Sequence, residues 1–366
     1  MIELTWDQVR AFRAGRSLNS DDGLVETARR LSGVQAQVMS NAELALAVRV
    51  EGLSVQEVRD ALWEDRELVK TWAMRGTLHL LPSDEIALWA GALRTRAFMW
   101  RRPTWLRYYG VEPAELENLI AAIAAAIERE PLTREEIARL AGEVAGPKVE
   151  EHLASGWGSL LKPVAMEGGL VFGPNRGRNV VFVGPRGWLG PFDAWESEQA
   201  MREIARRWLG VYGPGSHHDL ARWWGTASGR ARKALDLLDG EVVDVSIEGR
   251  PALALETDLR ELRSASMDGR ARLAPGFDPY TVGFFPREGL VEPEFLPRVS
   301  RTAGWISPVV LVGGKPVAVW KHTLRRGRLE ITVEPFRKLT AARLKELAPD
   351  AERIAEALGA TSVVVA

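Results

Sequence analysis

Residues 216–256 read SHHDLARWWGTASGRARKALDLLDGEVVDVSIEGRPALALE, and this stretch decides the fold class. A helix is expected to open at Ser216, because Ser216 can cap it and Asp219 stands at the third helical position, the spacing of a capping box. Another helix begins near Ala227, and strands at 241–247 and 251–256 follow on either side of a Glu-Gly-Arg turn. Helix, turn, helix and hairpin in this order predict a helix–turn–helix with a β-wing.

The same pattern recurs twice upstream. In the first part of the chain, Thr5 with Gln8 and Ser54 with Glu57 show the capping-box spacing of helix starts. These helices precede two short strands around Arg75 and Gly76. In the second part, Thr133 and Glu136 repeat the capping-box spacing, and residues 169–183 read as a hairpin. The chain after residue 259 is rich in strands until 333, with a hairpin on Gly313-Gly314, a final helix at about 340–358 and a terminal strand at 363–365.

These patterns predict an α+β fold with three tandem winged-helix units and a C-terminal β-rich portion. A winged helix lays one helix in the major groove, so three of them predict a concave DNA-binding scaffold. The alternative is that the units serve only packing or protein contacts. The expected segments are 1–82 (winged helix 1), 83–130 (helical connector), 131–190 (winged helix 2), 191–258 (winged helix 3) and 259–366 (the C-terminal β-rich portion with its terminal helix).

Composition excludes several kinds of chemistry. The chain has 366 residues and no cysteine, which excludes disulfides, cysteine-ligated metals and a cysteine nucleophile. No apolar run is long enough to span a bilayer, and the N-terminus does not read as a secretory signal, so we expect a cytoplasmic protein. The net charge is −1, yet 40 of the 48 basic residues are arginines, whose forked guanidinium suits phosphates. A GC-rich genome would give the same bias.

A Gln–apolar–Gln triplet, Gln35-Ala36-Gln37, stands in the first segment after Gly33. With residues 72–79 (WAMRGTLH), 273–280 (LAPGFDPY) and 319–321 (VWK), it makes essentially the whole chain resemble the AlkZ-like family of bacterial DNA glycosylases. These winged-helix proteins remove alkylated purines and unhook azinomycin-type interstrand crosslinks. Related branches carry Asp in place of the second Gln. The resemblance implies that Gln35 and Gln37 are the catalytic pair.

The chemistry of such a pair is consistent with that substrate. An N7- or N3-alkylated purine is already cationic and leaves without a strong general acid, while amide oxygens can orient a water and face the developing positive charge. Residues i and i+2 do not share a face of a helix but do so in an extended chain. We therefore expect residues 33–38 not to be regular α-helix. The competing interpretation is that the two glutamines cap or bridge the first unit.

Other residues are expected to bind duplex DNA. They are basic side chains or a histidine in the predicted wings, helices and hairpin tips: Arg75, His79, Arg176, Arg178, Arg230, Arg232, Lys233, Arg325, Arg326 and Arg328. His79 could equally be a structural histidine. Asp278 lies in a Pro-Gly-Phe-Asp-Pro loop and could support the site from behind, or cap a turn. His217 and His218 read as part of a helix start rather than as metal ligands.

The sequence therefore predicts a monofunctional DNA glycosylase, since no lysine stands out as a Schiff-base nucleophile. No cofactor and no metal are expected. The expected partner is double-stranded DNA that carries alkylated purines or crosslinks, bound in an open cleft without a deep base pocket. Protein partners are not indicated by the sequence, and no membrane partner is expected. A non-catalytic winged-helix DNA-binding regulator is the main alternative, and a structural protein that does not bind DNA is the other.

Overall fold

The computed structural model describes residues 2–19, 22–155 and 159–366. The chain divides into two compact units. Unit 1 comprises residues 1–59 and 204–366, and unit 2 comprises residues 60–203. In the described ranges, no helix combines the length and the apolarity that crossing a bilayer requires.

Unit 1 begins with a strand and helices whose ends follow their capping residues. Thr5 and Gln8 form the expected capping box at the start of the first long helix. The early elements are β1 (Ile2–Leu4), α1 (Trp6–Leu18), α2 (Leu24–Arg30), β2 (Val34–Gln35) and α3 (Met39–Ala47), followed by α4 (Val55–Trp63), within which the boundary between the units falls. Ser54 and Glu57 form the expected capping box at the start of α4.

The chain returns to unit 1 within α12 (Ser197–Tyr212), which is followed by α13 (His217–Trp224), α14 (Ser228–Asp236), β8 (Val242–Ile247) and β9 (Arg250–Leu255). Ser216 and Asp219 cap α13 as expected. β8 and β9 pair antiparallel, and β1 adds in parallel beside β8, giving a sheet of order β1-β8-β9. Neither β1 nor its pairing with β8 was expected from the sequence.

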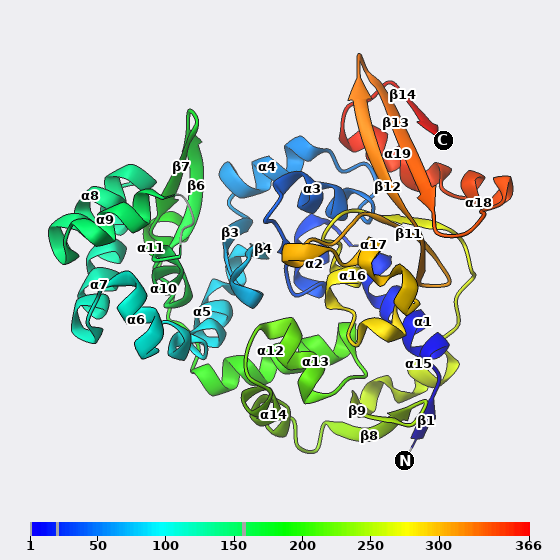
Figure 1. Cartoon of the computed structure of the whole chain (residues 1–366), viewed down its shortest axis with the longest axis horizontal. Helices are drawn as coiled ribbons and strands as arrows, with labels where there is room; N and C mark the ends of the chain where they lie inside the picture. The colour runs from blue at the N-terminus through cyan, green and yellow to red at the C-terminus, as the bar shows by residue number, and fades with distance from the viewer. Residues whose placement is uncertain (1, 20–21, 156–158) are drawn as a thin grey trace. The chain divides into compact units, whose positions relative to one another are not determined.

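The rest of unit 1 is built around a mixed five-stranded sheet of order β10-β11-β12-β13-β14. Its elements are α15 (Leu259–Ser264), β10 (Arg272–Ala274), α16 (Pro279–Gly283), α17 (Leu296–Val299), β11 (Val309–Val312), β12 (Lys315–Arg325), β13 (Arg328–Pro335), α18 (Ala341–Lys345), α19 (Ala348–Ala357) and β14 (Ser362–Val365). The single terminal helix expected at 340–358 is two helices, because Pro349 stands in the first turn of α19 and lacks the N–H that an unbroken helix needs. The hairpin of β12 and β13, orange in Figure 1, stands out from the helices of its own unit.

The core of unit 1 joins segments that are far apart in sequence. Leu44 and Val48 at the end of α3 pack with Trp320 of β12, Ile331 of β13 and Ile354 of α19 in one buried cluster. The indole N–H of Trp320 donates to a backbone carbonyl at 3.0 Å, so the buried ring keeps a hydrogen-bond partner. Burial of these apolar side chains fixes α3, and with it the segment that precedes α3, against the sheet.

Unit 2 consists of helices and two antiparallel hairpins. Its elements are β3 (Leu68–Trp72), β4 (Leu78–Pro82), α5 (Ile86–Arg94), α6 (Pro103–Tyr109), α7 (Pro113–Arg129), β5 (Leu132–Thr133), α8 (Arg134–Ala145), α9 (Pro147–Ala154), α10 (Leu161–Met166), β6 (Val171–Arg176), β7 (Asn179–Val183) and α11 (Pro185–Leu189). β5 adds to the β6–β7 hairpin in the order β5-β7-β6. Trp72, Phe172 and Phe182 pack against one another with ring centroids 4.9–6.1 Å apart, so the two hairpins share a core.

The compact units differ from the linear segments expected from the sequence. Residues 1–82 are divided between unit 1 and unit 2, and the C-terminal portion belongs to the same unit as the N-terminal helices. The physical reason lies in long-range contacts that local sequence patterns do not contain, such as the parallel pairing of Leu4 with Ile247 and the packing of α3 against α19.

Candidate functional site

The Gln35–Gln37 segment follows directly on the end of α2. Ser32 and Gly33 both adopt positive φ angles, +55° and +90°, and the Gly33 N–H donates to the carbonyl of Ala28 at 2.9 Å. This is the geometry of a helix terminated by a left-handed turn, in which glycine is favoured at the final position. The chain therefore leaves α2 abruptly and enters an extended segment.

Residues 34–38 are not helical, as expected from the sequence. Val34 and Gln35 form β2, and Val38 is extended at the start of α3. Val34 and Ala36 are buried, and Gln35 and Gln37 alternate with them. Gln35 ends the strand β2, and Gln37 lies in the bend that leads to α3, so both amides belong to a short non-helical segment.

The two glutamines differ in exposure. Gln35 is 8% exposed, whereas Gln37 is exposed. Gln35 is thus held within the protein and Gln37 is open to solvent. An amide offers both an acceptor oxygen and a donor nitrogen, so the pair can hold a water or a polar group of a ligand without carrying charge.

The loop that contains Asp278 packs behind this segment. Val38 contacts the small cluster of Phe277, Val282 and Ile306, and a Cβ placed on Gly276 would lie 2.8 Å from the side-chain nitrogen of Asn41. Gly276 therefore permits a close approach between the loop and the first turn of α3 that no larger residue allows. The stretch 273–280 and the Gln triplet, which are far apart in the sequence, are neighbours in unit 1.

Asp278 holds this arrangement through a buried ion pair that sequence reasoning missed. Its two carboxylate oxygens each accept a hydrogen bond from Arg49 at 2.9 Å, and both side chains are 0% exposed. Asp278 also accepts from the backbone N–H of Tyr280, so it caps α16. Capping a turn was one of the two roles expected of Asp278. Its partners Arg49 and Tyr280 both lie outside the Gln35–Gln37 triplet.

Arg49 anchors three parts of unit 1 at once. Besides Asp278, its guanidinium donates to the carbonyls of Ser17 and Ala45, both at 2.6 Å. Arg49 ends the turn after α3, so the ion pair joins α1, α3 and the 275–279 loop. A lone arginine after an apolar helix gave no signal in the sequence that could reveal this role.

Arg75 and His79 come together on the β3–β4 hairpin of unit 2. Nη2 of Arg75 lies 3.5 Å from Nε2 of His79, and Nδ1 of His79 donates to the carbonyl of Thr77 at 3.0 Å. His79 is 1% exposed, and burial, reinforced by the charge of Arg75, lowers its pKa to about 3. His79 is therefore a neutral, buried side chain, which favours the structural alternative over a phosphate contact.

The other predicted DNA-binding residues lie on exposed elements. Arg176 ends β6 but forms an ion pair with Glu136 at 3.1 Å and donates to the Pro131 carbonyl, so it ties its hairpin to α8. Arg178 lies exposed in the turn of the same hairpin. Arg230, Arg232 and Lys233 lie exposed on α14, with Arg232 3.2 Å from His217.

Arg325, Arg326 and Arg328 occupy the tip of the β12–β13 hairpin. All three are exposed, and Arg325 and Arg328 face each other in the register. Arg326 and Gly327 have φ angles of +50° and +77°, as a two-residue type I′ turn requires. The tip therefore presents three positive charges on a rigid, twisted ribbon.

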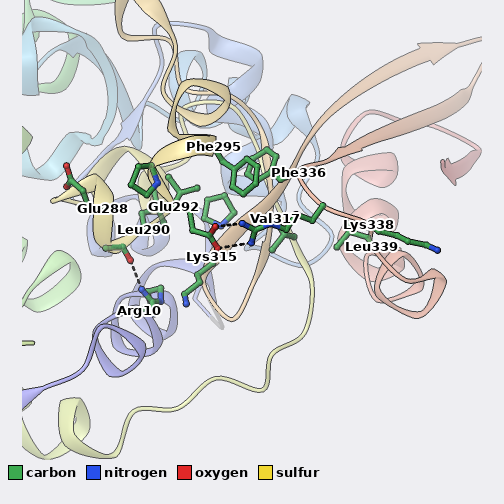
Figure 2. A pocket seen from close by; sticks show the side chains of 15 residues that line it. Arg10, Glu288, Leu290, Glu292, Phe295, Lys315, Val317, Phe336, Lys338 and Leu339 are labelled. Atoms are coloured by element: carbon green, nitrogen blue, oxygen red, sulfur yellow. Dashed lines mark hydrogen bonds and ion pairs between the residues drawn. The ribbon is translucent and has the colours of Figure 1, made fainter.

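Unit 1 also contains a pocket of about 420 Å³ that none of the predicted site residues lines. Figure 2 shows Phe295 and Phe336 stacked on one side of it, with ring centroids 4.8 Å apart. Arg10 lines the pocket and donates to the carbonyl of Gly289, while Arg337 is paired with Glu292 (Figure 2). Its lining comes from segments distant in sequence, so no single motif indicated it.

Known proteins resemble this chain over its whole length. The family model described as DNA glycosylase AlkZ-like matches residues 28–357. An interstrand DNA cross-link repair glycosylase of Streptomyces sahachiroi is 35% identical over 376 residues, covering 100% of this chain and 99% of the relative. The solved structure of Streptomyces sahachiroi DNA glycosylase AlkZ superposes with a TM-score of 0.87 at 33% identity and covers 100% of both chains. The sequence predicted a mixture of helices and strands, and the fold of the solved structure confirms this mixture.

Proposed function

The chain belongs to the family of AlkZ-like DNA glycosylases, and from this premise we propose that it hydrolyses the N-glycosidic bond of cationic N-alkylated purines in duplex DNA. The observation that carries the proposal is the non-helical segment between α2 and α3, which holds Gln35 in the strand β2 and leaves Gln37 exposed two residues later.

The proposed reaction needs little proton transfer to the base. An N7- or N3-alkylpurine leaves as a neutral base once the bond to the sugar breaks, and the positive charge moves to the sugar. In our proposal Gln37, which is exposed, holds the attacking water, and Gln35, which is buried beside it, orients that amide. The amide oxygens also face the oxocarbenium-like charge. An undamaged purine would need acid catalysis and should react poorly.

We further infer that the protein binds duplex DNA through tandem winged helices. In residues 197–255, α12, α13 and α14 precede the β8–β9 hairpin, and in residues 132–183, β5 and α8 to α10 precede the β6–β7 hairpin. Helices followed by a hairpin wing are the pattern of a winged helix. The proposal includes a third winged helix in residues 1–82. We also propose an open, concave binding site, because a crosslinked base stays tied to the other strand and cannot enter a deep pocket.

The relative from Streptomyces sahachiroi is named for interstrand crosslink repair, and this chain keeps glutamine at both positions of the triplet. We therefore include crosslink unhooking in the proposed substrate range. We also propose that the protein works in the cytoplasm, on the chromosome, without a metal or an organic cofactor and without cutting the strand.

The test is release of free 7-methylguanine from methylated duplex DNA. We expect release by the wild-type protein, loss of release in a Gln35→Ala/Gln37→Ala variant that still binds the duplex, and unchanged release in Gln199→Ala, a matched change at an exposed glutamine of α12. A crosslinked duplex serves as a second substrate. Duplex binding by the wild-type protein with no release from either substrate would overturn the proposal in favour of a non-catalytic DNA-binding regulator.

A further inference from the structure

Three cationic side chains of unit 2 converge on the turn between β3 and β4. Arg75 and Gly76 occupy this turn with φ angles of +56° and +70°. A Cβ placed on Gly76 would lie 3.7 Å from Nζ of Lys162, which comes from α10, and 3.8 Å from Nη2 of Arg96, which follows α5. The glycine thus leaves room for two cationic ends to meet beside Arg75.

The three side chains differ in depth. Arg96 is 2% exposed and donates from Nη1 to the carbonyl of Ala73 at 3.2 Å, which fixes its guanidinium under the turn. Arg75 and Lys162 are only partly buried. The cluster of three cations is therefore held in place by the buried Arg96, while Arg75 and Lys162 keep part of their surface exposed to solvent.

The surroundings of Arg96 and Lys162 disfavour their charged forms. Burial, followed by the charge of Arg75, lowers the pKa of Arg96 to about 10. Burial, followed by the charge of Arg96, lowers the pKa of Lys162. Like charges held close together in a partly desolvated place store electrostatic energy, which a bound anion would release. Structural packing alone would be served better by uncharged residues.

We propose that Arg75, Arg96 and Lys162 form a binding site for one phosphate of the DNA backbone. The site rests on the proposed function, since it requires duplex DNA as the ligand. Arginine forks and a lysine ammonium are the groups that proteins use for phosphate oxygens. A contact of this kind sets the position of the duplex without reading its sequence. His79, buried and neutral beside Arg75, orients that guanidinium rather than touching the phosphate.

The experiment compares duplex affinity at two salt concentrations. One phosphate contact contributes about 0.9 to the slope of log Kd against log salt, so the ratio of Kd values at about 200 mM and about 50 mM salt should fall in Lys162→Gln, by up to about 3.5-fold when the whole phosphate contact is lost. The loss of affinity should be equal on methylated and undamaged duplexes. Lys162→Arg should restore the wild-type ratio, which separates charge from folding. Lys148→Gln, an exposed lysine on α9 of the same unit, is the matched control and should leave the ratio unchanged.

A second measurement reads the site directly. In protein with 13C-methylated lysines, the pKa of Lys162 should start below its usual range and rise when a short duplex is added. Inorganic phosphate alone at matched salt should raise it less. An equal rise with inorganic phosphate, or an unchanged salt ratio in Lys162→Gln, would overturn the DNA-phosphate site. Either result leaves base release by the wild-type protein intact, so failure of this site is distinguishable from failure of the proposed function.

Discussion

At the scale of single residues, the arrangement of the candidate site depends on buried polar side chains more than on the glutamines themselves. Val38 rests on the loop around Phe277, and that loop is held by the ion pair of Asp278 and Arg49. A buried pair of this kind contributes specificity of position, and it becomes costly when one partner is removed. The position of the Gln triplet therefore depends on residues that lie outside it in the sequence.

Removing the positive partner should destabilise unit 1 strongly. We expect Arg49→Met to lower the free energy of unfolding by about 3–5 kcal/mol, because the Asp278 carboxylate would stay buried without its counter-charge. Urea unfolding followed by circular dichroism measures this change. Lys321→Met removes a cation from the exposed pair with Glu334 and should cost less than about 1 kcal/mol. Similar losses of stability in both variants would show that the buried pair has no special role.

His79 should make stability depend on pH. Its pKa is about 3 in the folded protein, below the ordinary value of 6.5, so between these values the unfolded chain binds a proton that the folded protein does not. Stability should therefore be complete above pH 6.5 and fall as the pH is lowered, by up to about 1.4 kcal/mol per pH unit. Urea unfolding at several pH values should show a shallower fall in His79→Gln. An identical pH dependence in both proteins would mean that the pKa of His79 does not change on folding.

At the scale of elements, the β6–β7 and β12–β13 hairpins both carry arginines predicted to bind DNA, and the structure distinguishes these two hairpins. The β6–β7 hairpin commits Arg176 to Glu136 within its own unit. The β12–β13 hairpin is longer, and its three tip arginines are exposed around a type I′ turn. A basic ribbon of this kind can enter a groove or grip a phosphate. We therefore expect the second hairpin to contribute more to duplex binding.

The tip can be neutralised without disturbing its turn. In Arg325→Gln/Arg326→Asn/Arg328→Gln, the new Asn-Gly pair suits the positive φ angles at 326 and 327, so the hairpin should persist. Duplex affinity should fall, and the salt slope should decrease by about 0.9 for each phosphate that the tip no longer binds. Far-UV circular dichroism verifies folding. Lys315→Gln/Lys338→Gln/Lys345→Gln removes the same charge elsewhere in unit 1. An equal effect of the two triple variants would contradict a specific role for the tip.

At the scale of the whole molecule, unit 1 is assembled from both ends of the chain. β1 pairs with β8 across more than 200 residues of sequence, and Arg13 of α1 donates to the carbonyls of Gly213, Pro214 and Phe285 at 2.7–3.2 Å. Unit 2 is continuous in sequence and has its own aromatic core. The two units should therefore differ in how they tolerate being separated from the rest of the chain.

We expect residues 60–203 expressed alone to unfold cooperatively in urea, because the aromatic core of Trp72, Phe172 and Phe182 lies within them. Residues 204–366 expressed alone should show no cooperative transition, since they lack the strand and the arginines supplied by residues 1–59. Adding residues 1–59 as a separate chain should restore structure measurable by circular dichroism. A cooperative transition in the isolated 204–366 segment would show that the N-terminal contacts are dispensable.

Local features of this protein were determined by the sequence itself. The capping boxes at Thr5, Ser54, Thr133 and Ser216 begin helices where they were expected, and Gly33 ends the helix before the Gln triplet. These features depend on hydrogen bonds within three to five residues, so they can be read from spacing. The family likewise followed from motifs that stand in the sequence, and the comparisons confirmed it.

Only the tertiary structure decided the rest. The pairing of β1 with β8, the Arg49–Asp278 ion pair and the cluster of Arg75, Arg96 and Lys162 each join residues separated by many positions. The interpretation of His79 also depended on the structure, because burial is the larger cause that lowers its pKa, ahead of the charge of Arg75. Long-range contacts and burial depend on how the whole chain packs. A linear pattern of residues specifies neither the distance between two side chains nor how much hydration each loses on folding.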